Sequence, residues 1–173
     1  MNLTEEISAG NSKEMCMRIV EWVGNAQDRF DELIELFFTA ESRIMQRAAW
    51  PVSYCVMAHP GLICTHFGRL VANLRRPGLH NAIKRNTIRL LQSTEIPEPY
   101  QGEIMDICFQ YITSPKEAAA VKAFSLTVLG NLSRVYPDIV PEIKLVIEER
   151  WSTETPAFRS RARRFLAGQN TKE

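Results

Sequence analysis

The sequence has no apolar run long enough to cross a membrane, because Arg, Asn or Glu interrupts even its most hydrophobic stretches. A membrane-spanning helix needs about 20 consecutive apolar residues. The segment 1–10 contains Glu5 and Glu6 and no basic residue, whereas a secretory signal begins with positive charge. We therefore expect a cytoplasmic protein that does not enter a membrane.

Motifs of the common catalytic and nucleotide-binding sites are also missing. The chain has no GxSxG elbow, phosphate-binding loop, dinucleotide-binding glycine pattern or HExxH zinc motif. None of its four cysteines forms a CxxC pair, and without an export signal we expect reduced thiols rather than disulfides. The sequence favours a protein with no cofactor and no catalytic residues.

One cluster of metal-ligating residue types remains, formed by Cys55, His59, Cys64 and His66. Zinc prefers four such ligands in a tetrahedron. On a helix, however, the side chains of Cys64 and His66 would diverge by about 200° because they are two residues apart. The spacing also fits known zinc patterns poorly. We therefore predict no metal site, and the same geometry argues against Cys55 and His59 as a nucleophile and its base.

Acidic residues are absent from residues 42–94, a run that carries eight lysines and arginines. The rest of the chain, taken together, has a net negative charge. Residues 1–41 carry a net charge of −6, residues 95–158 carry −5 and residues 159–173 carry +4, so that the whole chain has a net charge of +1. Such segregation within a nearly neutral chain requires a geometric explanation.

The apolar pattern of the sequence returns every 37 or 38 residues. Within each repeat the apolar residues follow helical spacing. Interleaved apolar columns with one period are typical of helix pairs stacked along a chain. The four columns are Met45, Ile83, Val121 and Phe158; Leu33, Leu70, Cys108 and Val146; Phe30, Phe67, Met105 and Ile143; and Ile34, Val71, Phe109 and Ile147.

The pattern predicts an all-α chain with one N-terminal helix and four antiparallel helix pairs, in a single domain over residues 1–173 with flexible ends at 1–11 and 168–173. Pro51 falls inside one of these helices, where it removes a backbone donor and crowds the preceding turn, so we expect a kink or break after Trp50. The N-terminal helix is expected near 12–24, the first helices of the pairs near 26–38, 61–76, 98–113 and 138–152, and the second helices near 41–58, 79–93, 115–135 and 156–167.

The expected second helices resemble those of HEAT repeats. In that family an aliphatic–basic pair is followed by a small residue and then by another aliphatic one. The chain has this pattern at Val121–Lys122, Ile83–Lys84 and Phe158–Arg159, and more weakly at Met45–Gln46. The usual aspartate in the turn before the second helix is absent, so residues 26–167 look like a divergent, armadillo-type relative. The resemblance implies a right-handed α-α superhelix, or solenoid, with its second helices on the concave face.

On that scheme most acidic residues fall on the first helices and most basic residues on the second. The resemblance thus implies a basic concave face, which would attract an acidic partner. Structural roles remain open: in HEAT repeats the basic residue of the pair often bonds to a turn carboxylate, Trp50 could fill the core at the kink, and Arg161, Arg163 and Arg164 could belong to a solvated capping helix. The candidate partner-binding residues are Arg43, Arg47, Trp50, Lys84, Arg85, Arg89, Lys122, Arg159 and Arg163.

Two functions fit such a face. The first is a non-catalytic interaction module that holds an acidic or extended segment of a protein partner, as the fold commonly does. The second is binding of DNA or RNA, because some HEAT-like bacterial proteins are alkylpurine DNA glycosylases. Lys84, Arg85, Arg89, Arg159 and Arg163 would then contact phosphates. The chain departs from those enzymes in having fewer repeats, and its four aspartates all map to first helices, so no tryptophan–aspartate pair is expected on second helices.

Overall fold

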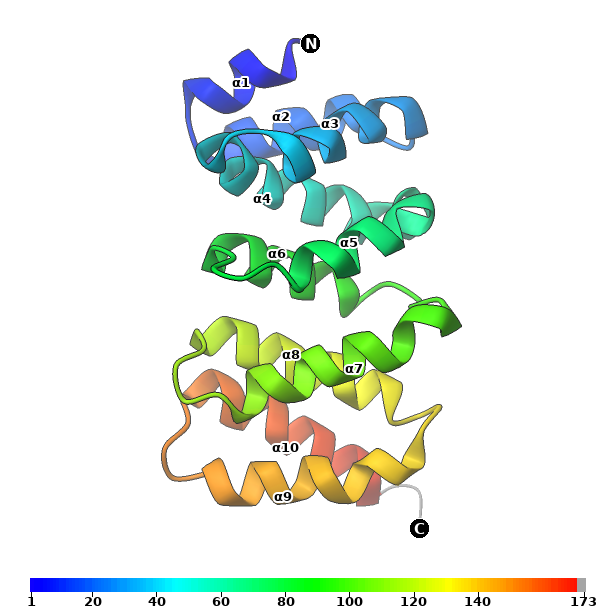
Figure 1. The fold of residues 1–173 in the computed structure, drawn as a ribbon, viewed down its shortest axis with the longest axis vertical. Coiled ribbons are helices and arrows are strands. Elements are labelled where there is room, and N and C mark those ends of the chain that lie inside the picture. Colours follow the sequence, from blue (N-terminus) through cyan, green and yellow to red (C-terminus); the bar gives the residue numbers. More distant parts are fainter. Residues whose placement is uncertain (171–173) are drawn as a thin grey trace. The chain divides into compact units, whose positions relative to one another are not determined.

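The computed structural model describes residues 1–170 of the chain (Figure 1). Within these residues all regular structure is helical, with ten α-helices, two short 3-10 helices and no strand. The chain divides into two compact units, Met1–Pro97 and Glu98–Glu173. A single domain over residues 1–173 therefore stays a prediction, and residues 171–173 of the expected flexible end lie outside the described residues.

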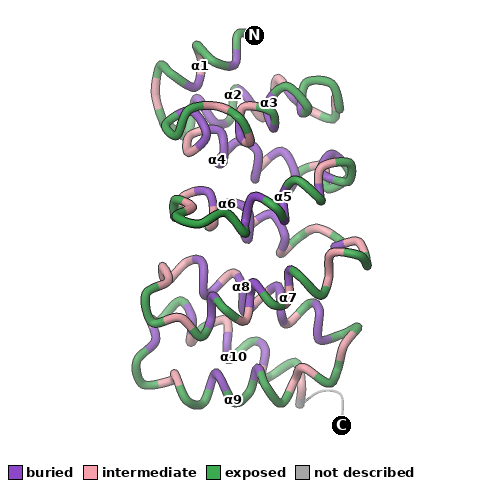
Figure 2. The backbone as a smooth tube through the Cα atoms, viewed as in Figure 1, coloured by how far each residue is buried: buried purple, intermediate pink, exposed green. Residues whose placement is uncertain are grey.

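Helix α4 is the centre of packing in the first unit, because it contacts α1, α2, α3, η1 and α6. Apolar side chains at helical spacing line the facing sides, and Figure 2 shows them as buried stretches that alternate with exposed ones along each helix. The elements are α1 (Leu3–Ala9), α2 (Lys13–Val23), α3 (Gln27–Thr39), α4 (Ser42–Ala58), the 3-10 helix η1 (Pro60–His66), α5 (Phe67–Leu74) and α6 (Asn81–Leu91).

Local signals set the ends of the N-terminal helices. The side chains of Asn2 and Ser12 accept hydrogen bonds from the backbone N–H of Glu5 and Met15, which caps α1 and α2. Gly24 ends α2 with φ of 52°, a left-handed conformation that glycine adopts without steric cost. These caps allow the sharp turn from α2 into α3.

In the second unit, helix α8 packs against both α7 and α10. The side chains of Ile104, Val128, Ile143 and Phe158 are completely buried and form part of its core. The elements are α7 (Glu98–Thr113), α8 (Ala119–Leu132), the 3-10 helix η2 (Pro137–Ile139), α9 (Val140–Arg150) and α10 (Pro156–Asn170).

The predicted apolar columns form the cores of both units. All members of the columns that start at Met45 and Leu33 are buried. In the other two columns Met105 and Phe109 are only half-buried, while the remaining members are buried. The buried stripe of α7 also includes Ile104 and Ile112, so it is rotated relative to the stripes of the other first helices.

Several expected elements differ in the structure. Residues 3–9 of the expected flexible end form α1, and its side chains of Leu3 and Ile7 are buried. The helix expected over 61–76 is divided into η1 and α5, and that over 138–152 into η2 and α9. The helix expected from residue 115 begins at Ala119.

Of the kink or break expected after Trp50, the break is wrong, and the kink stays a prediction. Helix α4 continues through Pro51, whose ring is buried together with Val52 and Cys55. The hydroxyl of Ser53 donates a hydrogen bond of 2.8 Å to the carbonyl of Trp50. Tertiary packing around the proline therefore outweighs the loss of one helical hydrogen bond.

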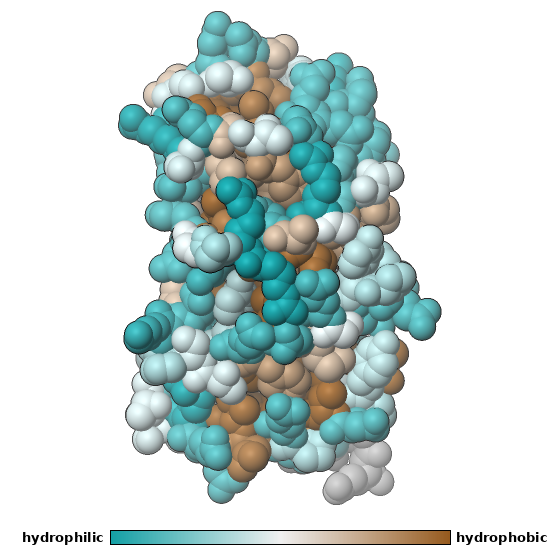
Figure 3. Space-filling model, viewed as in Figure 1, coloured by the Kyte–Doolittle hydropathy of each residue, from teal (hydrophilic) through white to brown (hydrophobic). Residues whose placement is uncertain are grey.

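No helix in the described part of the chain combines the length and the apolar character that crossing a membrane requires. Hydrophilic side chains dominate the face shown in Figure 3, with apolar side chains among them over the segment of α9. Leu145 on α9 is 54% exposed.

Candidate functional site

A cavity of about 290 Å³ lies between the second helices α4 and α6 in the first unit. It brings together four residues that the sequence analysis assigned to the binding face: Arg43, Arg47 and Trp50 from α4 and Arg85 from α6. Among the residues that the structure describes, no acidic side chain lines it. Its other lining residues are Asn11, Gln46, His80, Ala82 and Asn86. We call this the α4–α6 cavity.

The arginines of the α4–α6 cavity differ in their environment. The side chains of Arg43 and Arg85 are exposed. Arg47 is half-buried, and its Nη1 donates hydrogen bonds of 3.0 Å and 2.9 Å to the carbonyls of Ile7 and Ser8. These carbonyls belong to the last turn of α1, where the helix dipole favours a cation. Arg47 therefore holds α1 against α4, while Arg43 and Arg85 face solvent.

An aromatic pair and a buried amide support the cavity. The half-buried ring of Trp50 packs edge-on against Tyr54, with ring centroids 6.3 Å apart. The guanidinium of Arg89 lies 5.7 Å from the Tyr54 ring, within cation–π range. The side-chain amide of Asn86 donates to the carbonyl of Ala82 at 2.9 Å and is buried. Lys84, on the same helix, is half-buried and does not line the cavity.

In the second unit, Lys122 lies inside the core rather than on the surface. Its Nζ lies 2.6 Å from Oε1 of Glu154, in the turn before α10, and the two side chains are 6% and 3% exposed. Nε of Arg150 donates to the same oxygen at 2.9 Å, and its Nη1 donates to the carbonyl of Thr113 at 2.8 Å. The sequence left open that the basic residue of the aliphatic–basic pair bonds to a carboxylate in a turn, and Lys122 makes such a bond. It links α8 to the turn that precedes α10.

Burial and ion pairing act in opposite directions on Glu154. Burial raises the pKa of its carboxyl, because a low-dielectric surrounding disfavours the charged form. The hydrogen bonds from Lys122 and Arg150, together with their positive charges, outweigh that effect and hold the pKa below the ordinary value of 4.5. The buried carboxylate is thus ionised at neutral pH.

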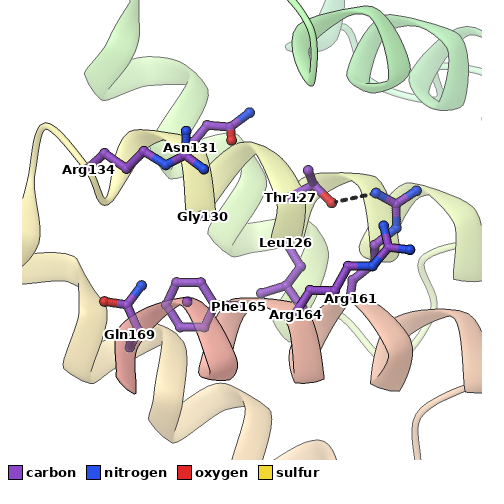
Figure 4. A pocket seen from close by; sticks show the side chains of 10 residues that line it. Leu126, Thr127, Gly130, Asn131, Arg134, Arg161, Arg164, Phe165 and Gln169 are labelled. Atoms are coloured by element: carbon purple, nitrogen blue, oxygen red, sulfur yellow. Dashed lines mark hydrogen bonds between the residues drawn. The ribbon is translucent and has the colours of Figure 1, made fainter. Parts of the chain in front are cut away.

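A second cavity, of about 460 Å³, lies between α8 and α10. Figure 4 shows Arg161 and Arg164 together on one side of it and Arg134 on the other, with Leu126 and Phe165 between the two helices. We call it the α8–α10 pocket. Its lining also contains Thr127, Gly130, Asn131, Gly168 and Gln169, and within residues 1–170 it includes no acidic residue.

The two arginines of α10 that were predicted to bind a partner, Arg159 and Arg163, do not line this pocket. Arg159 is half-buried and does not line the pocket, and the exposed guanidinium of Arg163 lies 5.3 Å from the ring of Trp151. The pocket instead uses Arg161 and Arg164, which are three residues apart and share one helix face. This three-residue spacing is visible in the sequence and could have predicted that Arg161 and Arg164 act together. No sequence pattern predicted a role for Arg134, just beyond α8, because only the packing of α8 on α10 makes it part of the pocket.

The cysteines and histidines that the sequence offered as metal ligands lie in different environments. Cys55 is buried, and burial raises the pKa of its thiol to about 12, whereas the side chain of Cys64 is exposed. Nε2 of His66 lies 2.6 Å from Oδ1 of Asp31, across from the edge of the Phe30 ring. Among the described residues, no group of three or more His, Cys, Asp or Glu side chains is arranged to hold a metal ion.

Comparison with known proteins identifies the repeat family. Neither the curated proteins nor the solved structures contain a match to the chain. A family model of the HEAT repeat domain matches residues 2–168, which is nearly the whole chain. The match agrees with the 37- to 38-residue period, with the helix pairs and with the burial of the periodic apolar residues inside each unit. The chain belongs to the HEAT repeat domain family.

Proposed function

We propose that this HEAT repeat domain is a non-catalytic interaction module whose α4–α6 cavity binds an acidic, extended segment of a protein partner. The observation that carries the proposal is that Arg43, Trp50 and Arg85, from two adjacent second helices, line one cavity without any acidic side chain. Within their own unit these residues belong to the acid-free run of residues 42–94.

The chemistry of these side chains suits a carboxylate-bearing partner. A guanidinium can donate two parallel hydrogen bonds to one carboxylate, which gives both energy and orientation. Arginine and tryptophan are also enriched among the residues that dominate binding energy at interfaces. Since Arg43 and Arg85 stand on packed helices, binding would have to order their exposed side chains but not the backbone that carries them.

The dimensions of the cavity favour single side chains of an extended segment. Pockets for small molecules commonly have volumes of about 300–1,000 Å³. At about 290 Å³ the α4–α6 cavity lies at the lower end of that range and can receive one side chain at a time. Neighbouring residues of the segment would then lie along α4 and α6.

Binding of DNA or RNA is the rival function, and the overall charge weighs against it. Domains that bind nucleic acid commonly have an isoelectric point above 9 and a continuous basic patch. This chain has a net charge of +1 and an isoelectric point of about 7.7. A glycosylase would further need an acidic residue at the damaged base, and none lines the α4–α6 cavity beside Trp50.

The test compares two double charge reversals that alter the net charge equally. Binding of a fluorescently labelled deca-glutamate peptide to the full chain is measured at about 50 mM salt. We expect R43E/R85E to weaken binding by at least about tenfold, because each charge-assisted contact is lost and replaced by repulsion. The control K116E/K144E changes two exposed lysines of the second unit, one in the turn before α8 and one on α9, and should bind as the wild type does.

Two results would overturn the proposal. The first is an equal loss in both double variants, which would mean that only net charge attracts the peptide. The second is tighter binding of a labelled DNA duplex than of the peptide, with a log–log salt slope near −0.9 for each phosphate contacted. That result would establish the rival function instead.

A further inference from the structure

We propose that the α8–α10 pocket is a binding site for a phosphomonoester, and that the group is carried by a phosphorylated tyrosine side chain of an extended protein segment. The pocket lies entirely within the second unit. The inference is therefore independent of the α4–α6 cavity and of the function proposed for it.

The anion end of the pocket is formed by Arg161 and Arg164. They are one turn apart on α10, and Figure 4 shows their guanidiniums side by side. Nη1 of Arg161 donates a hydrogen bond of 3.2 Å to the hydroxyl of Thr127 on α8, and its guanidinium lies 5.8 Å from the ring of Phe124. Arg161 is thus already oriented by the facing helix before any ligand binds.

The charge of this pair favours a phosphate over a carboxylate. The two positive charges stand three residues apart on one helix face, and none of the described residues that line the pocket is acidic. A phosphomonoester carries a charge of about −1.5 to −2 at neutral pH, so that it balances both guanidiniums. Its three terminal oxygens can accept hydrogen bonds from both guanidiniums, whereas a carboxylate has one negative charge and only two oxygens.

The remainder of the pocket is larger than a phosphate, and its wall combines apolar residues with the polar side chains of Thr127, Asn131, Arg134 and Gln169. Leu126 and Phe165 line it beside Gly130, which contributes no side chain. A Cβ atom at Gly130 would lie 3.3 Å from Cδ2 of Phe165, so the glycine lets this ring approach α8 closely. The volume of about 460 Å³ leaves space for an organic group behind the phosphate. A flat aromatic ring fits the available volume and can pack against the apolar part of the wall.

The open rim of the pocket indicates a ligand presented by a larger partner. Arg134, Arg164 and Gly168 line the pocket and are exposed, so its mouth faces solvent. Free small molecules are typically buried over about 70–90% of their surface. Across the pocket from Arg164, Arg134 and Asn131 are placed to contact the peptide backbone or a further acidic side chain of the same segment (Figure 4).

The experiment measures the affinity of the full chain for a labelled glycine–serine nonapeptide with one central phosphotyrosine. We expect this peptide to bind at least about tenfold more tightly than the same peptide with tyrosine or glutamate at that position. Arg164→Ala should weaken its binding about tenfold, and Arg161→Ala should act in the same direction. The matched control is Arg163→Ala on the same helix, whose guanidinium contacts Trp151 outside the pocket and whose loss should leave affinity unchanged.

Dependence on pH provides a second readout that a structural role of the arginines would not produce. The second ionisation of a phosphomonoester has a pKa near 6, so binding of the phosphopeptide should weaken as the pH falls from about 7.5 to about 5. The same peptide with a sulfated tyrosine keeps its single charge over this range and serves as the control. Thermal melting of each variant checks that Arg164→Ala and Arg161→Ala remain folded.

Three results would overturn the inference. Equal affinity for the phosphotyrosine and glutamate peptides would remove the phosphate preference. Unchanged affinity in folded Arg164→Ala and Arg161→Ala would remove the site. Binding of adenosine monophosphate or phenyl phosphate as tight as that of the phosphopeptide would replace the protein segment with a free phosphate ester as the ligand. R43E/R85E should leave phosphopeptide binding intact, so failure here and failure of the α4–α6 proposal are distinguishable.

Discussion

Nζ of Lys122 lies 2.6 Å from Oε1 of Glu154, and both side chains are almost completely removed from solvent. The contact spans 32 positions of the chain and links α8 to the turn before α10. Arg150 joins the pair and reaches the last carbonyl of α7, at Thr113. One buried carboxylate therefore connects three helices of the second unit.

Removing the lysine should destabilise the protein strongly. In Lys122→Met the Glu154 carboxylate stays buried and keeps only Arg150, so we expect the free energy of unfolding to fall by about 3 kcal/mol. The double variant Lys122→Met/Glu154→Leu removes both buried charges and should recover part of that loss. Urea unfolding measures all three proteins. The exposed Lys144→Met serves as control, and an equally large effect there would contradict the role of the buried pair.

Acid should weaken this cluster within a defined range of pH. The folded-state pKa of Glu154 is lowered, against the effect of burial, by hydrogen bonds and charges from Lys122 and Arg150. A lowered pKa contributes stability above the unfolded-state value of about 4.5, and this contribution is lost as the pH falls through the folded-state pKa. The difference in unfolding free energy between the wild type and Glu154→Gln should therefore be largest near pH 7 and shrink below about pH 4.5. A constant difference down to about pH 2 would contradict this.

The period of the sequence was sufficient to predict the cores, because burial in stacked helix pairs depends on apolar residues at a fixed spacing. The columns that start at Met45 and Leu33 are buried throughout. The alternative role of Lys122 was also visible in the aliphatic–basic pattern. Its partner was harder to identify, because Glu154 occupies a turn where HEAT repeats usually carry aspartate.

Features that depend on contacts between distant residues were missed. Helix α1 has only Leu3 and Ile7 as buried residues, too short a stripe for a periodic pattern to reveal. It is secured from other helices: Arg47 hydrogen-bonds its last carbonyls, and Arg18 on α2 forms an ion pair with Glu6. The α8–α10 pocket likewise exists only because two helices meet, so its arginines could not be separated from those of a solvated helix face by sequence alone.

Arg47→Ala should release α1 while leaving the remainder of the first unit folded. The change removes two hydrogen bonds from a charged donor to the carbonyls of Ile7 and Ser8. Such bonds contribute about 1.5–3 kcal/mol, so amide hydrogen exchange in α1 should accelerate by roughly 10- to 100-fold. Arg43→Ala, an exposed arginine on the same helix, is the control and should leave α1 protected. Equal acceleration in both variants would contradict the specific contact.

One cysteine should react much faster than the other three in the native protein. Burial raises the pKa of Cys16 to about 11 and those of Cys55 and Cys108 to about 12, which keeps these thiols protonated and inaccessible. Cys64 is exposed. A thiol-specific chromogenic disulfide at about pH 8 should therefore label one site rapidly, and labelling should disappear in Cys64→Ser. Denaturant should expose all four, and rapid labelling of more than one native thiol would show that the buried cysteines are accessible.

Two glycines inside helices provide a matched test of the packing at the α8–α10 pocket. Gly102 in α7 faces open space, so Gly102→Ala should raise the free energy of unfolding by about 0.5–1 kcal/mol through the gain in helix propensity. Gly130 in α8 has the same intrinsic gain available, but its new Cβ would meet the Phe165 ring at 3.3 Å. The ring would have to shift by a few tenths of an ångström, and this strain should cancel most of the gain. Urea unfolding distinguishes the two variants: equal stabilisation would mean that Phe165 does not rest against α8, and the pocket would then lack the apolar wall described above.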